Sequence, residues 1–190
     1  MANKQKLSGR SYFEKSSKNW YELWCPRQIS LIEKKKIVVP ELSDRNRFGL
    51  AEPSVYYGDT VCGIVLKPET RENILYILGL LNSIAVEFFF KNTTVPKAGG
   101  YYIYKTMFLK NIPIRIINFN DPADVARHDQ MVNLVEQMLE LNKKLAESKM
   151  PHATEILKRQ IDATDRQIDD LVYKLYDLTD EEIKIVESET

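Results

Sequence analysis

The last 90 residues of this 190-residue chain contain no glycine, because all seven glycines lie at or before position 100. Glycine destabilises helices, so a stretch without it can form long ones. Apolar residues and one threonine recur there every three or four positions, in two series: Met131, Leu134, Met138, Leu141, Leu145, and then Leu157, Ile161, Thr164, Ile168, Leu171, Leu175, Leu178. This spacing predicts two helices, each with one stripe that faces a partner helix.

A short loop is predicted between these two helices. Pro151 lies between the two series, and a proline inside a straight helix would remove a backbone hydrogen bond. Residues 148–152 are therefore expected to connect two antiparallel helices. Further on, Thr179 and Glu182 have the spacing of a capping box, which predicts a short last helix that ends at about Val186.

The first part of the chain combines strand and helix patterns. Thr70 is a plausible N-cap of an apolar helix, and Asn82-Ser83 indicates a break inside it. The apolar run of residues 74–90 contains Glu87 and is shorter than the roughly 20 residues that a membrane span needs. We interpret it as a buried core helix. Aromatic or β-branched runs indicate strands at residues 20–24, 36–40, 47–50 and 61–66.

These patterns predict an α+β fold in two parts. Residues 1–118 are expected to form a lobe with a mixed β-sheet and a buried helix. Residues 119–190 are expected to form an antiparallel two-helix, coiled-coil-like spacer and a short C-terminal helix. The length of the chain allows one ordinary domain with an appendage, or two small domains.

The two parts carry opposite charge, although the formal net charge is zero. Residues 1–118 contain 18 Lys and Arg against 10 Asp and Glu, whereas residues 119–190 contain 9 against 17. The basic part also alternates its cations with aromatic residues, as at positions 18–21 and 101–105. DNA attracts such a surface through its phosphates, and aromatic groups can add stacking. A solvated face of an ordinary domain is the alternative interpretation, because charge asymmetry indicates possible partners and is not a motif.

No pattern typical of catalysis stands out. The sequence has no phosphate-binding loop, no glycine-rich dinucleotide motif and no metal-ligand spacing. His128 and His152 are isolated and fit surface or capping roles. Cys25 and Cys62 are far apart and fit small buried residues in a reducing cytoplasm. The polar N-terminus lacks the apolar run of a signal peptide. We therefore expect a cytoplasmic chain that binds rather than catalyses, with no metal or cofactor of its own.

Several stretches in order resemble a known family. They are residues 20–24, 36–40, 47–48, 78–84, 99–104 and 112–114, followed by a tail at 168–182. This order is similar to the TaqI-like C-terminal specificity domain of type IIG restriction-modification enzymes and related adenine DNA methyltransferases, from about Ser11 to Val186. The resemblance implies a target recognition domain that reads double-stranded DNA. It implies that a separate methyltransferase domain or subunit binds S-adenosylmethionine and methylates an adenine. The matching upstream part is absent, so the chain looks like a C-terminal fragment or a separately encoded specificity piece.

The physical argument locates the DNA contacts on two loops. Arg and Lys suit guanine and phosphate, Asn and Gln suit adenine, and loops can protrude from a rigid sheet. The predicted contacts are Arg45, Asn46 and Arg47 on one loop, Lys91, Lys97, Tyr101, Tyr104 and Lys105 on the other, and, more weakly, Arg27 and Gln28. Arg45 and Arg47 could instead be scaffold charges. About half of the tyrosines at 101, 102 and 104 should lie in the core, as should Trp20 and Trp24.

A second class of function stays open. The helical part could dimerise or dock another subunit, and the basic lobe would then be incidental. Salt-sensitive DNA association that survives deletion of the helices would distinguish DNA recognition from this protein–protein interaction module. A small stand-alone enzyme is the third class, and no acid, base or nucleophile constellation supports it.

Overall fold

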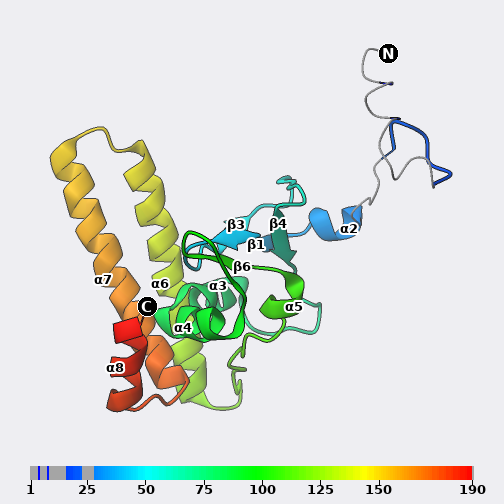
Figure 1. Cartoon of the computed structure of the whole chain (residues 1–190). Coiled ribbons are helices and arrows are strands. Elements are labelled where there is room, and N and C mark those ends of the chain that lie inside the picture. Colours follow the sequence, from blue (N-terminus) through cyan, green and yellow to red (C-terminus); the bar gives the residue numbers. More distant parts are fainter. Residues whose placement is uncertain (1–3, 5–7, 9–15, 23–27, 190) are drawn as a thin grey trace.

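Two small antiparallel sheets and a set of helices build the fold, which confirms the expected α+β class (Figure 1). The computed structural model describes residues 4, 8, 16–22 and 28–189. Its elements are α2 (Ile29–Ile32), β1 (Lys36–Pro40), β2 (Leu42–Ser43), β3 (Gly49–Ala51), β4 (Val61–Ile64), α3 (Ile74–Asn82), α4 (Ile84–Thr93), β5 (Pro96–Lys97), β6 (Tyr101–Ile103), α5 (Thr106–Leu109), α6 (Pro122–Glu147), α7 (Pro151–Leu175) and α8 (Asp180–Glu189).

The chain passes directly from one sheet to the other. The first sheet has the order β3-β1-β4 and the second the order β2-β6-β5. Only Glu41 separates β1 from β2. All pairings among the described strands are antiparallel, so two antiparallel sheets replace the mixed sheet that the sequence suggested. Ile37 and Val39 of β1 are fully buried, and they anchor the first sheet to the core.

The long apolar helix is two helices that meet at a bend. Asn82 ends α3, Ser83 caps α4, and the two axes differ by 65°. The predicted break is confirmed. The predicted start is wrong, because the Asn73 side chain accepts a hydrogen bond from the Leu75 N–H at 2.9 Å and α3 begins at Ile74 rather than after Thr70. No single helix in the described part of the chain is long and apolar enough to cross a membrane, although the bent pair α3 and α4 together passes that test of length and composition.

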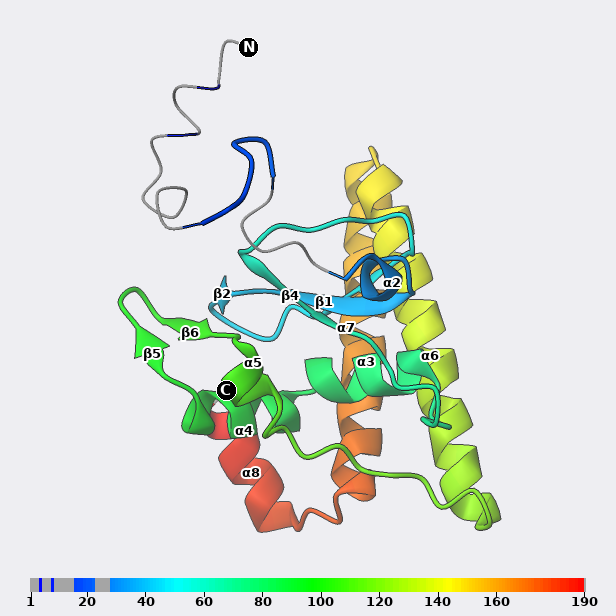
Figure 2. The same cartoon turned by 90° about the vertical axis from the view of Figure 1, so that its right-hand side faces the viewer.

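The helical hairpin of α6 and α7 stands beside this bent pair (Figures 1 and 2). Its connection consists of residues 148–150, in agreement with the loop predicted from Pro151. α3 packs closely against α6 because Gly79 has no Cβ. A Cβ there would lie 2.9 Å from Cγ2 of Val135. The capping box is confirmed, since Thr179 and Glu182 bond to each other, and α8 continues three residues beyond Val186.

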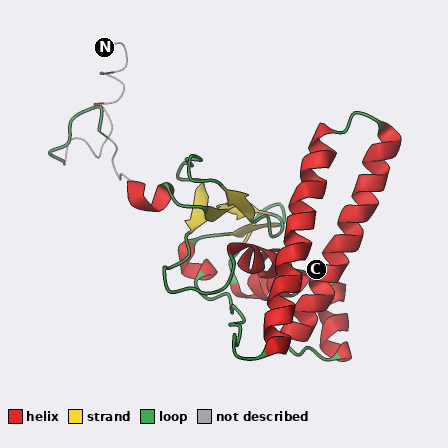
Figure 3. Cartoon of the chain, turned by 180° about the vertical axis from the view of Figure 1, so that it is seen from behind, coloured by secondary structure: helices red, strands yellow, loops and turns green. Residues whose placement is uncertain are grey.

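One hydrophobic cluster joins the two parts of the chain. It contains Ile37 of β1, Leu80 of α3, Phe90 of α4, Met131 of α6 and Val172 of α7. These four helices therefore share a core with the first sheet, and Figure 3 shows the hairpin standing at the side of the sheets away from α2. The core is therefore continuous across the predicted division at residue 118. Separate unfolding of the two parts stays a prediction.

Two tyrosines hold the segment that leads from α5 to α6. The Tyr76 hydroxyl donates to the Arg115 carbonyl at 2.8 Å, and the Tyr176 hydroxyl donates to the Pro113 carbonyl at 2.6 Å. The buried carboxylate of Asp124 accepts from the Asn118 N–H at 2.9 Å and forms an ion pair with Arg115. This connection is thus fixed at several points, which orients α6 relative to the lobe.

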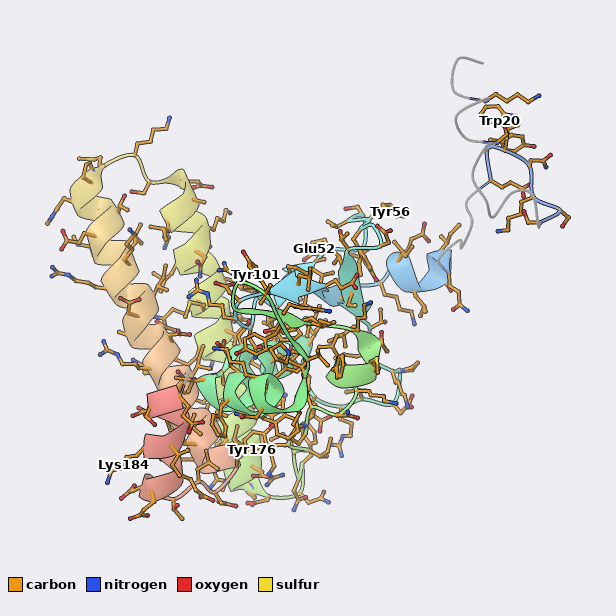
Figure 4. The ribbon with its side chains drawn as sticks, viewed as in Figure 1. Trp20, Glu52, Tyr56, Tyr101, Tyr176 and Lys184 are labelled. Atoms are coloured by element: carbon orange, nitrogen blue, oxygen red, sulfur yellow. The ribbon has the colours of Figure 1, made fainter. Side chains whose placement is uncertain are left out.

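The predicted strand at residues 20–24 is not present in its described portion. Trp20 and Tyr21 form a turn, and the Glu22 N–H donates to the Asn19 carbonyl at 2.9 Å. Trp20 lies outside the core cluster, with its ring edge-on to Tyr21 (Figure 4). The alternation of aromatic and polar residues at positions 20–24 therefore did not indicate a strand in the described residues 20–22. Trp24, like Cys25, lies outside the described residues.

Candidate nucleic-acid interface

The second sheet brings the two predicted loops together. Strand β2 pairs with β6, so that Ser43 lies opposite Tyr102, and β6 pairs with β5, so that Tyr101 lies opposite Lys97. Residues 44–48, which we call the recognition loop, leave β2 beside this sheet. Gly99 and Gly100 turn the chain between β5 and β6 with φ of 81° and 78°, a left-handed conformation that favours glycine.

Asn46 ties the recognition loop to the core. Its backbone N–H donates to Oε2 of Glu87 at 2.9 Å, and its Nδ2 donates to the Leu81 carbonyl at 2.7 Å. Its Oδ1 accepts from the Tyr104 hydroxyl at 2.8 Å. Every polar group of this buried amide side chain is therefore bonded from inside the protein, which fixes the middle of the loop.

Asn82 fixes the end of the same loop. Its Oδ1 accepts from the Phe48 N–H, and its Nδ2 donates to the Phe48 carbonyl, both at 3.0 Å. The amide thus pairs with one backbone unit in the way that a neighbouring strand would. Two asparagines, one on the loop and one at the end of α3, hold the loop against the bend between α3 and α4.

Burial corrects the prediction for Asn46 and Tyr104. Asn46 is 8% exposed and Tyr104 is fully buried. Tyr104 stacks on Phe90 with ring centroids 4.4 Å apart, and burial raises the pKa of its hydroxyl. A side chain in this position cannot reach a base edge unless the corner opens. Both residues belong to the scaffold that shapes the loop, and they leave the set of direct contacts.

The two arginines lie on either side of this anchor and point outward. Arg45 and Arg47 are exposed. The Arg47 guanidinium donates to both oxygens of Asp44, at 3.0 and 3.2 Å, and holds the pKa of that carboxyl below its usual value. Arg45 lies near α7, where its positive charge opposes the rise in the pKa of Asp165 that burial causes. The hydrogen bonds of Asn46 therefore hold the backbone on which both arginine side chains are mounted.

The lysines of the second loop differ in what surrounds them. Lys91 is largely buried and pairs with Glu87 at 2.7 Å, and Lys105 pairs with Glu41 at 2.9 Å. Lys97 of β5 is exposed. Lys91 is therefore the least accessible of these lysines, whereas Lys97 and Lys105 are exposed, as are Arg45 and Arg47. Arg47 and Lys105 each already pair with a carboxylate, so Arg45 and Lys97 are the exposed cations of this face that form no ion pair with another described residue.

Tyr101 and Tyr102 of β6, and Tyr104 just after it, differ in burial. Tyr101 is 46% exposed, Tyr102 is partly buried and Tyr104 is inside the core. Tyr101 is thus accessible to solvent, and it lies close enough to Arg47 for the two groups to interact electrostatically. It is an aromatic group next to the exposed cations, as base stacking or sugar contact requires.

Gln28 does not join this group. It precedes α2, whose end is linked to the first sheet because Nζ of Lys36 donates to the carbonyls of Ile32 and Glu52. Gln28 is exposed, but it lies at the other sheet. Arg27 lies outside the described residues.

Sequence reasoning missed the residues that position the loop. The sequence patterns interpret Asn82 as part of a helix break and Glu87 as a charge inside an apolar run, and neither interpretation predicts a contact with residues 44–48. Both are polar residues inside an otherwise apolar run. A polar side chain in such a run needs a hydrogen-bond partner when it is buried, and that was the available signal. Among the described residues, no group of three or more His, Cys, Asp or Glu side chains could hold a metal ion.

Comparison with known proteins identifies relatives of this arrangement. The chain is 29% identical over 124 residues to the type II methyltransferase M.BanIII of Aneurinibacillus aneurinilyticus, an alignment that covers 59% of this chain and 20% of the relative. It is 33% identical over 127 residues to the type II methyltransferase M.HincII of Haemophilus influenzae, covering 63% and 25%. It is 34% identical over 120 residues to the type II methyltransferase M.HindII of the same species, covering 60% and 23%.

These alignments cover only a fifth to a quarter of the length of each relative. The family match covers residues 3–114, which include both sheets, the recognition loop and the bent pair α3 and α4. The chain belongs to the family of TaqI-like C-terminal specificity domains.

Proposed function

We propose that this chain is the DNA target recognition part of a restriction-modification system, either the C-terminal part of a type IIG-like enzyme or adenine DNA methyltransferase, or a separate specificity piece. It would read the base sequence of double-stranded DNA in the cytoplasm and would not catalyse by itself. Its partner would be a methyltransferase domain or subunit, which would bind S-adenosylmethionine. The helical hairpin would help to set the orientation of the lobe relative to that partner.

The observation that carries this proposal is the anchored recognition loop. Specific reading needs donors held at fixed positions, because a base-edge hydrogen bond discriminates only when its geometry is defined. Asn46 fixes the backbone between Arg45 and Arg47 from inside the protein. The family match supports the same function, since it places this loop within a specificity domain.

Binding to duplex DNA is the first test. Labelled random-sequence duplexes titrated with the 190-residue chain should show association that weakens with salt. With about five phosphate contacts, the slope of log K against log salt should be about −4 to −5. If no association occurs even at low salt, DNA recognition by this chain is wrong.

Replacement of the two loop arginines tests sequence reading. Duplexes that the wild-type chain selects from a random pool should share a short motif, and Arg45→Ala with Arg47→Ala should relax one or more of its positions. A base-reading arginine contributes about 1–3 kcal/mol of discrimination. The control pair, Arg166→Ala with Lys184→Ala, removes the same charge from α7 and α8 and should leave the motif unchanged. An unchanged motif in the loop variant would make Arg45 and Arg47 scaffold residues.

A further inference from the structure

The negative charge of the helical part is not spread along its length. Residues 143–160, which we call the hairpin tip, carry five cations against two carboxylates: Lys143, Lys144, Lys149, Lys158 and Arg159 against Glu147 and Glu155. Residues 119–142 carry one cation against five carboxylates, and residues 161–189 carry three against ten. The far end of an acidic hairpin is therefore basic.

The hairpin tip projects from the molecule and takes no part in the core. The far ends of α6 and α7 extend beyond the sheets and the bent pair of helices in all three views (Figures 1, 2 and 3). None of residues 143–160 is buried, and all five cations are exposed. The core cluster ends with Val135 on α6 and begins with Ile168 on α7. The hairpin tip contributes no buried residue to the core, so packing of the core does not explain the length or the charge of the tip.

One face of α7 connects the tip to the recognition loop. Lys158, Asp165 and Asp169 are separated by seven and four residues, so they lie on the same face of the helix. Asp169 accepts a hydrogen bond from the Ile84 N–H at 2.8 Å, and Asp165 lies near Arg45. This face therefore points toward the lobe, and Lys158 lies on the same side as the recognition loop.

The spacing suits an elongated polyanion. At 1.5 Å per residue, Lys158 lies about 10 Å along α7 from Asp165, and Lys149, just beyond the start of α7, lies roughly 20 Å from it. Successive phosphates of one DNA strand advance about 3.4 Å along the duplex axis, so this span corresponds to about six base pairs. The ion pairs of Lys144 with Glu140 and of Arg159 with Glu155 are exposed. Such pairs are weak in water and can yield to a phosphate.

We propose that the hairpin tip is a second DNA-binding surface, which contacts phosphates of the duplex about six base pairs to one side of the bases that the recognition loop reads. This inference rests on the proposed function. Phosphate contacts of this kind fix register and orientation without reading sequence. The carboxylates Asp162 and Asp165 lie between the loop and the tip, so the duplex is bound at two separated points rather than along the whole of α7.

A charge-matched pair of variants tests the proposal. The tip variant combines Lys149→Gln, Lys158→Gln and Arg159→Gln. The control variant combines Arg166→Gln, Lys174→Gln and Lys184→Gln, which removes the same residue types and the same charge from exposed positions nearer the base of the hairpin and on α8. Circular dichroism should show that both keep the wild-type helix content.

The measurement is binding of the 190-residue chain to a labelled duplex of about 30 base pairs across a salt series. Loss of three phosphate contacts should reduce the slope of log K against log salt by about 2–3 and weaken binding at low salt at least tenfold. The control variant should keep the wild-type slope.

Each other outcome is decisive. If the wild type binds DNA and the tip variant matches it in slope and affinity, the hairpin tip does not contact DNA and the proposed function is untouched. If both variants lose the same amount, the effect is one of general charge and the inference is wrong. If the wild type fails to bind any duplex at low salt, the proposed function fails and the inference with it.

Discussion

The bend between α3 and α4 and the hairpin tip differ in where their polar groups find partners. At the bend, Asn82 bonds to Phe48, the Ile84 N–H bonds to Asp169, and Glu87 bonds to Asn46. At the tip, the cations point into solvent. Internal partners fix geometry, whereas exposed cations remain available to an external anion. The bend is therefore suited to hold a reading loop in place, and the tip is suited to bind a charged partner without selecting its sequence.

Equal substitutions in the shared core and in the hairpin tip should have very different effects. Leu171 of α7 is 4% exposed in the shared core, whereas Leu157 in the tip is only partly buried. Leu171→Ala should lower the free energy of unfolding by about 2–5 kcal/mol, because it leaves a cavity. Leu157→Ala, the matched control, should cost clearly less, and thermal and denaturant unfolding measure both. Comparable losses would show that the tip is as tightly packed as the base.

Hydrogen exchange on Leu171→Ala also tests the division of the chain. The shared core predicts that protection falls in the lobe and in the helices together. A fall confined to residues 119–190 would instead support two units that divide at residue 118.

Asparagine substitutions should separate an internal role from an exposed one. Asn46→Ala removes the side-chain partner of the Tyr104 hydroxyl and of the Leu81 carbonyl, which should cost about 1–3 kcal/mol, and it keeps the backbone N–H that bonds to Glu87. Asn142→Ala is the control, because this exposed side chain bonds only to the Met138 carbonyl one turn earlier. In DNA selection, Asn46→Ala should blur the motif and keep the salt slope. A sharp motif with the wild-type slope would mean that the loop does not depend on its anchor.

The smallest expected effect depends on pH. Burial raises the pKa of the Asp169 carboxyl to about 7 from its ordinary 3.8, and the hydrogen bond from the Ile84 N–H opposes the rise. The folded-state pKa lies above the unfolded one, so folding takes up a proton in this window. This group's contribution to stability is fully present below about pH 4 and is lost as the pH rises through about 7.

Asp169→Asn should remove that loss. The amide keeps an oxygen for the Ile84 N–H and cannot ionise. At about pH 8 the variant should be more stable than the wild type by on the order of 1–2 kcal/mol, which corresponds to a melting temperature roughly 2–8 °C higher. Near pH 4 the two melting temperatures should approach each other. Asp162→Asn, an exposed control on the same helix, should show no such pH-dependent difference from the wild type. A constant difference between Asp169→Asn and the wild type across the range would show that ionisation of Asp169 is not the cause.

Local sequence patterns determined much of the framework. The spacing of apolar residues, Pro151 and the Thr179–Glu182 pair predicted the hairpin, its loop and the last helix, because each depends on residues within a few positions of one another. The Asn82-Ser83 break was also visible, since two polar residues interrupt an apolar run. The sequence likewise indicated the two segments that the second sheet later joins.

Tertiary structure alone decided which side chains face outward. Asn46 and Arg45 are neighbours in a polar stretch, and only the packing of the loop against the bend buries one and exposes the other. Asn73 rather than Thr70 starts α3, because Asn73 caps the helix and its N–H bonds to His128 of α6. The basic charge of the hairpin tip can be counted in the sequence. Only the fold shows that the tip lies away from the core and that one face of α7 points toward the recognition loop. A local pattern sets the conformation of a segment, whereas burial and facing depend on contacts between residues far apart in the chain.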